Sequence, residues 1–182
     1  GNHFDRVVLK IVLEKSTQVQ MIKSGEADFA SLAPVDSLPG LRKAEGVEVI
    51  TPKSWQNSMF WINTKKCPTD NLKIRQALSH AWDYNSVVDS IYNGLATVAQ
   101  GPVPKTMWGH NPDVPKYDFD LNKAAQLVEE SGIAKDQLKL SLAYIGTSQE
   151  YENCAQLLQA NLAQIGVQLE LCGGFLKPSD LF

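Results

Sequence analysis

Four tryptophans are the residues of this sequence best suited to binding chemistry. Trp55, Trp61, Trp82 and Trp108 all fall in or beside predicted strand ends and loops. Aromatic surfaces accompanied by a few amides are the usual way in which a binding pocket takes up a small organic ligand. The alternative is that each ring simply fills the core. That alternative is stronger for Trp82, which continues an apolar helix face, than for Trp55 and Trp108, which lie outside the regular helical faces.

Motifs for catalysis or for metal binding are absent from the sequence. It has no GxGxxG or GxxxxGK[ST] phosphate loop, no GxSxG nucleophile motif and no HExxH pair. His3, His80 and His110 are isolated, and we expect His80 to be solvated or linked to a helix cap rather than catalytic. A carboxylate pair for glycoside chemistry stays open, although no residue marks one. We therefore expect no enzymatic activity and no cofactor.

Charge and hydropathy restrict the partners of the chain. Its 17 basic and 20 acidic residues give a net charge of −3, which offers no electrostatic basis for binding nucleic acid. A hydrophobic content of 43% is ordinary for a globular protein. The most apolar run, residues 7–13, is far shorter than a membrane span and contains Lys10, so we expect a buried strand there. The first residues contain no secretory signal, which leaves both a mature and a truncated chain open.

The three cysteines have no metal-binding or redox spacing, because no CxxC pair occurs. Cys154 falls in a predicted helix and Cys172 in the strand that follows it. We expect plain buried thiols, and a disulfide is the alternative in an oxidising compartment.

A pattern of helix, glycine and strand occurs three times and predicts the fold class. Gly25, Gly132 and Gly166 each end a helical period and precede a β-rich run, where a helix C-cap favours a residue that tolerates positive φ. This alternation indicates an α/β domain with a sheet flanked by helices. The expected helices are 16–24, 36–44, 71–82, 85–93, 120–131 and 148–165. The expected strands are 6–13, 27–32, 46–51, 57–63, 138–145 and 167–172.

Helix starts and one long connection complete the prediction. Asp120 is the expected N-cap of the helix that follows it, and Thr147 with Glu150 forms a candidate capping box for the last helix. Residues 95–119, which we call the strap, contain four prolines and no regular period. So long a connection in a small domain is usually functional or linking, and its prolines favour an ordered, extended segment that carries Trp108.

The order of several short motifs resembles the dipeptide/oligopeptide-binding class of extracytoplasmic solute-binding proteins, which are receptors of ABC importers. Residues 60–109, "FWINTKKCPTDNLKIRQALSHAWDYNSVVDSIYNGLATVAQGPVPKTMWG", carry the central part. The matching positions are Asn63, Pro68, the segment 74–78 (IRQAL), the segment 81–83 (AWD), the segment 92–94 (YNG) and the segment 102–104 (PVP). "IKSGEADFA", "YDFDLNKAAQLVEESG" and "LAQIGVQLEL" extend the resemblance over nearly all of residues 4–172.

The resemblance implies a fold and a function. The fold would be an α/β lobe like those of periplasmic binding proteins, with a mixed sheet flanked by helices. Residues 1–182 would form one lobe of a larger two-lobe receptor, truncated at both ends. The protein would be a periplasmic or lipid-anchored monomer that binds a peptide or other small solute and delivers it to a membrane-embedded ABC permease. A sensing or peptide-chaperone module on the same fold is the alternative.

One departure from the family bears on the solute. Some dipeptide-binding members carry an arginine near the start of the last long helix, suited to a ligand carboxylate. Residues 148–156 here read "SQEYENCAQ" and contain Glu150 and Glu152 but no arginine. A fixed carboxylate clamp is therefore not expected, and a longer peptide held by its backbone, an oligosaccharide or a metal chelate becomes a plausible solute.

The resemblance also indicates where a ligand would be bound. In such two-lobe folds the cleft is lined by loops at strand ends, where side chains and backbone donors are accessible. Aromatic rings there would pack on the ligand, and amides would satisfy its backbone. The candidate ligand-binding residues are Trp55, Gln56 and Asn57, Trp108 in the strap, and Tyr144, Thr147 and Gln149.

Overall fold

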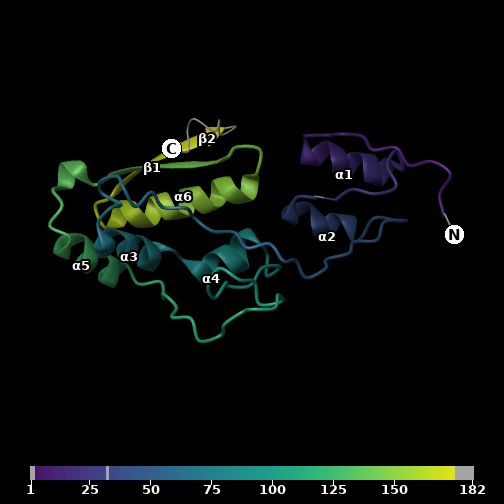
Figure 1. Cartoon of the computed structure of the whole chain (residues 1–182). Helices are drawn as coiled ribbons and strands as arrows, with labels where there is room; N and C mark the ends of the chain where they lie inside the picture. Colours follow the sequence, from purple (N-terminus) through teal and green to yellow (C-terminus); the bar gives the residue numbers. More distant parts are fainter. Residues whose placement is uncertain (1–2, 32, 175–182) are drawn as a thin grey trace. The chain divides into compact units, whose positions relative to one another are not determined.

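Figure 1 shows the computed structural model, which describes residues 3–31 and 33–174. The chain divides into two units, Gly1–Thr51 and Pro52–Phe182. The expectation that residues 1–182 make one lobe remains a prediction.

The first unit is built around one regular helix. Helix α1 spans Lys15–Ser24 and ends at Gly25, whose φ of 72° confirms the predicted C-cap glycine. The predicted helix 36–44 is a short 3₁₀ turn, η1 (Val35–Ser37), followed by the single helical turn α2 (Leu38–Leu41). Only a few side chains of this unit are buried, among them Val19, Met21 and Leu41.

Four predicted strands are not formed in the described residues. Segments 6–13, 46–51 and 57–63, and the described part of 27–32, form no hydrogen-bonded pair of strands. A β-strand exists only through hydrogen bonds to a neighbouring strand, and no described segment pairs with these. Their apolar side chains remain exposed, as at Leu9 (90%) and Ile11 (84%).

The second unit contains a parallel β–α–β arrangement. Strand β1 (Lys139–Ile145) pairs with β2 (Gln168–Gly174), from Lys139 opposite Gln168 to Ile145 opposite Gly174. Helix α6 (Gln149–Gln164) connects them and lies along the sheet (Figure 1). Helices α3 (Leu72–Ala81) and α5 (Leu121–Glu130) form the other layer, and the short turn η3 spans Lys135–Gln137. The predicted α/β class is confirmed.

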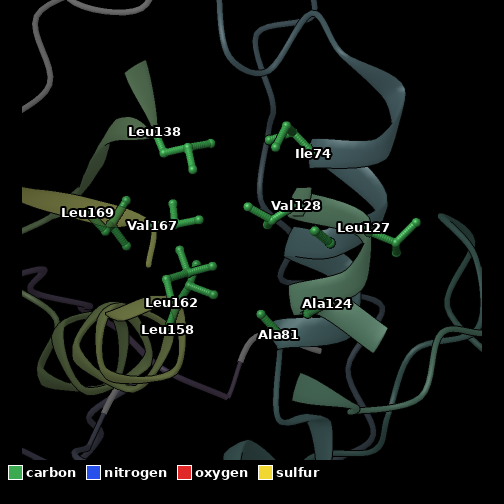
Figure 2. Packing of buried hydrophobic residues seen from close by; sticks show 11 residues of the cluster. Ile74, Ala81, Ala124, Leu127, Val128, Leu138, Leu158, Leu162, Val167 and Leu169 are labelled. Carbon is green, nitrogen blue, oxygen red and sulfur yellow. The ribbon is translucent and has the colours of Figure 1, made fainter. Parts of the chain in front are cut away.

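One hydrophobic cluster joins the two layers. Figure 2 shows Leu138, Val167 and Leu162 on the sheet and α6 side, with Ile74 and Val128 pointing toward them from α3 and α5. Ile74 and Leu162 are each only 1% exposed. Burying a side chain of this size stabilises a fold by roughly 1.5–3 kcal/mol.

The only buried polar residue in the described part of the chain also connects the two layers. Asn161 of α6 is 6% exposed, and its Nδ2 donates a hydrogen bond of 2.9 Å to the carbonyl oxygen of Ala81. Ala81 is the last residue of α3, where a helix leaves its carbonyl groups without intrahelical partners. The bond therefore satisfies a helix end inside the core.

The two helices predicted around Asp83 are separate, as expected, but the second is not a regular α-helix. Helix α3 stops at Trp82, and Asp83 caps the next turn by accepting from the Ser86 N–H at 3.0 Å. One α-helical turn, α4 (Tyr84–Ser86), is followed by a π-helical turn, η2 (Val87–Ile91). The chain then leaves the turn through Asn93 and Gly94, both with positive φ.

The remaining cap predictions were partly right. Asp120 is the N-cap of α5, since its Oδ1 accepts from the Lys123 N–H at 2.9 Å. The capping box at Thr147 was wrong by one residue, because Ser148 caps α6 and accepts from the Tyr151 N–H. The helix begins at Gln149, so Ser148 rather than Thr147 is positioned to reach the third N–H.

The cysteines behave differently from one another. Cys154 is buried as predicted, whereas Cys67 and Cys172 are exposed, and all three thiols are free. Cys172 is exposed because side chains alternate along β2 and Leu169 points to the core. The prediction that Cys172 is buried was therefore wrong. No helix in the described residues is long and apolar enough to cross a membrane.

Candidate functional site

The segment 54–61 carries three of the predicted site residues and lies against the helices of the second unit. The Phe60 ring packs edge-on against Trp82, with centroids 4.7 Å apart, and the Ser58 side chain hydrogen-bonds Tyr92. Trp55 and Trp61, on the odd-numbered positions, are 70% and 88% exposed. This segment therefore contacts the fold at Ser58 and Phe60 and leaves the large rings of Trp55 and Trp61 accessible.

The structure brings the predicted residues Trp55, Gln56 and Asn57 next to the strap. The Asn57 Nδ2 donates to the carbonyl oxygens of Gly101 at 3.2 Å and Pro102 at 3.3 Å. The Thr106 hydroxyl donates to the carbonyl oxygen of Ser54 at 3.3 Å. Two segments about 45 residues apart in sequence are thus fixed side by side.

Trp108 and Trp55 are the exposed rings that this arrangement offers. Trp108 is 92% exposed and follows Thr106, which is tied to the segment carrying Trp55. The Gln56 side chain is exposed, and its backbone N–H donates to Ser54 Oγ at 2.8 Å. The Asn57 amide nitrogen, by contrast, is engaged with the strap.

A second group of predicted residues lies at the carboxyl end of β1. Tyr144 is half-buried and its ring lies over Gly173, where an added Cβ would be 2.7 Å from the phenol oxygen. Thr147 and Gln149 are exposed at the start of α6, and Gln149 Nε2 donates to Asn153 Oδ1 at 3.0 Å. The carboxyl ends of parallel strands are where α/β folds place their ligands.

Tyr92, at the end of η2, connects the two groups. Burial raises the pKa of its phenol, and the nearby Cys154, Tyr151 and Glu150 raise it further, while the hydrogen bond from Ser58 lowers it. Ser58 belongs to the first group of segments, and the other three residues belong to α6. Tyr92 therefore lies between the segment 54–61 and the helix that starts beside Thr147.

Sequence reasoning did not select Tyr92, Ser58 or Tyr151 as site residues. Tyr92 entered the sequence analysis only within the expected helix 85–93 and within the family segment 92–94 (YNG). Its neighbours are far away along the chain, and no local period or motif reports such a contact. A half-buried tyrosine that follows a π-helical turn is visible only in the folded chain.

The buried thiol near this position is not a nucleophile. Burial raises the pKa of Cys154 to about 11, and the Glu150 carboxylate contributes. At neutral pH the group is a protonated thiol, which is unreactive compared with a thiolate. In the described residues no group of three or more His, Cys, Asp or Glu side chains is arranged to hold a metal ion.

The histidines also have structural partners. His80 Nδ1 lies 2.9 Å from the carbonyl oxygen of Asp118, and the ring packs edge-on against Tyr117 at 5.2 Å. The Asp120 N–H donates to the carbonyl oxygen of His80. His80 therefore anchors the end of the strap to α3, in keeping with the cap-linked role expected for it.

One shallow hollow lies apart from the predicted residues. It has a volume of about 270 Å³ and is lined by Cys67, Asp70, Asn71 and Ile133. Asn71 is the N-cap of α3, and its Nδ2 donates to the carbonyl oxygen of Ser131 at 3.3 Å. The hollow contains none of the aromatic or amide residues selected from the sequence.

Comparison with known proteins identifies the family. Residues 1–177 match the model of the bacterial extracellular solute-binding proteins, family 5, middle region. The chain belongs to family 5. The resemblance seen in the sequence is therefore confirmed, and so is the periplasmic-binding-protein-like fold.

Three similar family 5 proteins show how much of a member this chain represents. Heme-binding protein A of Haemophilus influenzae is 29% identical over 167 residues, which cover 90% of this chain and 30% of that protein. A probable D,D-dipeptide-binding periplasmic protein of Escherichia coli is 28% identical over 169 residues, covering 93% and 32%. The periplasmic binding protein DppA of Helicobacter pylori, solved with the peptide STSA, is 26% identical with a TM-score of 0.72, covering 88% and 31%. The chain spans about a third of the length of these relatives.

Proposed function

We propose that this chain is one lobe of a two-lobe receptor that binds peptides and delivers them to an ABC-type importer. The membership of family 5 over residues 1–177 carries this proposal, together with relatives named for binding a dipeptide or solved with a peptide. The receptor acts by binding, without catalysis, and as a monomer. It works outside the cytoplasmic membrane, free in the periplasm or lipid-anchored, and its partner is a membrane-embedded permease.

The ligand wall of this lobe consists of the seven residues selected from the sequence, with Tyr92 between their two groups. The exposed rings of Trp55 and Trp108 pack on ligand side chains, because aromatic faces bury much area at little entropic cost. Polar groups of Gln56, Thr147 and Gln149 satisfy the ligand backbone. The burial of Tyr92 and its neighbours Ser58 and Tyr151 support a continuous wall from the strap to α6.

The ligand is held by its backbone rather than by a carboxylate clamp. The first turn of α6 carries Glu150 and Glu152, which repel a carboxylate instead of pairing with it. A bidentate arginine would have favoured peptides of one fixed length. A backbone-directed site accepts longer peptides of varied sequence.

A non-peptide solute is the second candidate. The relative named heme-binding protein A is as similar to this chain as the dipeptide-binding one. Exposed tryptophans would stack on a flat macrocycle as readily as on a peptide side chain.

Native mass spectrometry of the natural polypeptide that carries this chain, purified without added ligand, separates the two candidates. A co-purifying series of masses that fragments into amino-acid residues is expected. A single mass with the porphyrin absorption band would identify haem, rather than a peptide, as the ligand. An empty protein that binds neither a mixed-sequence tetrapeptide library nor added haemin would contradict both.

Replacement of Trp108 tests the site itself. Trp108→Ala is expected to weaken binding of the tetrapeptide library tenfold or more, which corresponds to about 1.4 kcal/mol. Trp61→Ala is the matched control, because Trp61 is equally exposed but lies outside the selected residues. Unchanged affinity in Trp108→Ala, with intact folding, would remove Trp108 from the site.

A further inference from the structure

Residues 100–114 form a closed loop within the strap, which we call the Trp108 loop. Its two ends meet at a neck made by Gln100, Gly101, Pro112 and Val114. The Gln100 Nε2 donates to the carbonyl oxygen of Pro112 and, at 3.1 Å, to that of Val114. One amide side chain therefore closes a loop of about a dozen residues.

Close packing at Gly101 supports the same closure. Its φ is +77°, and an added Cβ would lie 3.3 Å from Val114 Cγ2. The carbonyl oxygens of Gly101 and Pro102 also accept from Asn57. The neck is thus fixed both to itself and to the segment that carries Trp55.

Internal hydrogen bonds order the loop beyond its neck. His110 Nδ1 lies 2.9 Å from the carbonyl oxygen of Val103, and the Met107 N–H donates to the carbonyl oxygen of Pro104 at 2.9 Å. Gly109 has a φ of +83°, typical of the third residue of a type II turn. Trp108 precedes it in that turn and projects into solvent.

We propose that Gln100 is a positioning residue for ligand binding, acting through Trp108 by closing the neck of the Trp108 loop. This inference rests on the proposed function of Trp108. A ring on a preformed loop loses little conformational freedom when it packs on a ligand, whereas a ring on an open loop must first be ordered. Gln100 contributes to affinity without touching the ligand.

Limited trypsin digestion measures the opening of the neck without any ligand. Lys105 is exposed within the loop, and cleavage requires local opening of the backbone. In the natural polypeptide that carries this chain, Gln100→Ala is expected to speed cleavage after Lys105 about tenfold. Gln164→Ala is the control, because the Gln164 amide donates within α6, to the carbonyl oxygen of Ala160, and among the described residues it makes no bond to the strap. An unchanged cleavage rate in Gln100→Ala would overturn the proposal.

Binding of the mixed-sequence tetrapeptide library, followed by native mass spectrometry, tests the role in affinity. Gln100→Ala is expected to weaken binding three- to tenfold, and the double variant with Trp108→Ala should bind no worse than Trp108→Ala alone. Additive losses would show that Gln100 does not act through Trp108. Faster cleavage with unchanged affinity in Gln100→Ala, while Trp108→Ala binds weakly, would refute the positioning role but leave the proposed function standing.

A backbone variant keeps the test independent of the glutamine side chain. Gly101→Ala places a side chain at a positive φ and against Val114. It should therefore open the same neck and reproduce both the faster cleavage and the weaker binding. If Trp108→Ala alone leaves affinity unchanged, the site assignment fails, whatever the cleavage rates show about the neck.

Discussion

Two β-rich runs of this chain have opposite outcomes. The run 138–145 contains β1 (Lys139–Ile145), which pairs in parallel with β2 through the whole of its length. Residues 6–13 are at least as rich in valine, leucine and isoleucine, yet they pair with no strand in the described part of the chain, and most of their side chains remain exposed. The difference teaches that β propensity marks a segment that can pair, while pairing itself depends on a partner brought close by the fold. Helix α6 brings that partner to β1.

The largest contrast should be between a core side chain of the β1–α6–β2 arrangement and a side chain of the run 6–13. Leu162→Ala removes a side chain that is 1% exposed between the sheet and helices α3 and α5, and should lower the free energy of unfolding by about 2–5 kcal/mol. Leu9→Ala, at a side chain 90% exposed, should change it by about 0.5 kcal/mol or less. Urea unfolding followed by circular dichroism measures both. A comparable loss at Leu9 would mean that residues 6–13 are buried against a partner strand.

The buried amide between the layers should give the next largest effect. Asn161→Ala leaves the Ala81 carbonyl oxygen without its 2.9 Å hydrogen bond and should cost about 1–3 kcal/mol in the same unfolding experiment. Gln159→Ala is a useful comparison, because its amide also leaves the helix but reaches the Leu169 carbonyl at a half-buried position. A loss at Asn161 no greater than that at Gln159 would contradict a special role for the buried bond.

Substitutions at helix caps should change stability by less, and by different amounts in the two units. Asp120→Ala removes a side-chain cap of α5 and should destabilise by about 0.5–2 kcal/mol. The N-cap of α1 is Glu14, whose side chain makes no cap hydrogen bond, so Glu14→Ala should have almost no effect. Introducing a good cap with Glu14→Ser should instead stabilise α1. Hydrogen exchange of the first turn of each helix measures these changes. Equal responses to Asp120→Ala and Glu14→Ala would contradict the expected difference between the two caps.

Alkaline pH should destabilise the second unit through its buried thiol and phenols, and by the smallest amount. All cysteines and tyrosines of the chain lie after residue 51, and burial raises the pKa values of Cys154, Tyr84 and Tyr92 in the folded state. A group whose folded pKa is raised contributes fully below its unfolded pKa and loses that contribution as pH rises through the folded value. For Cys154 the loss falls between pH 9 and about 11.

Urea unfolding at pH 8, 9 and 10.5 measures this alkaline loss. Cys154→Ala should flatten the pH dependence, and Cys172→Ala should leave it unchanged because Cys172 is exposed. The same slope in both variants would contradict the assignment to the buried thiol.

The sequence predicted the helices better than the strands for a physical reason. Helical hydrogen bonds are local, so periodicity, Asp120 and Gly132 were enough to place α5 to within a residue at either end. Strands need distant partners, and four of the six predicted strands have none in the described residues. The π-helical form of η2 also escaped prediction, because the residues from Val87 to Ile91 suit either kind of turn.

The candidate site could likewise be predicted only in its local part. Trp55, Asn57 and Trp108 could be selected individually as aromatic and amide residues in loops. Their mutual placement through Asn57 and Thr106 could not, because these hydrogen bonds join segments far apart in the chain. Tyr92 was missed for that reason, and its role in the site stays a proposal with theirs.

The π-helical turn η2 has a consequence for how this fold can vary. A π turn accommodates one residue more than an α turn over the same span. Loss of one residue between Val87 and Ile91 would restore α geometry over that span and leave Tyr92 close to its present place. The same deletion in a regular α-helix would rotate every later side chain by roughly 100° around the helix axis and carry the phenol away from Ser58 and Tyr151. The π turn is thus a place where the scaffold could lose a residue beside the candidate site without moving Tyr92 or rebuilding its interior.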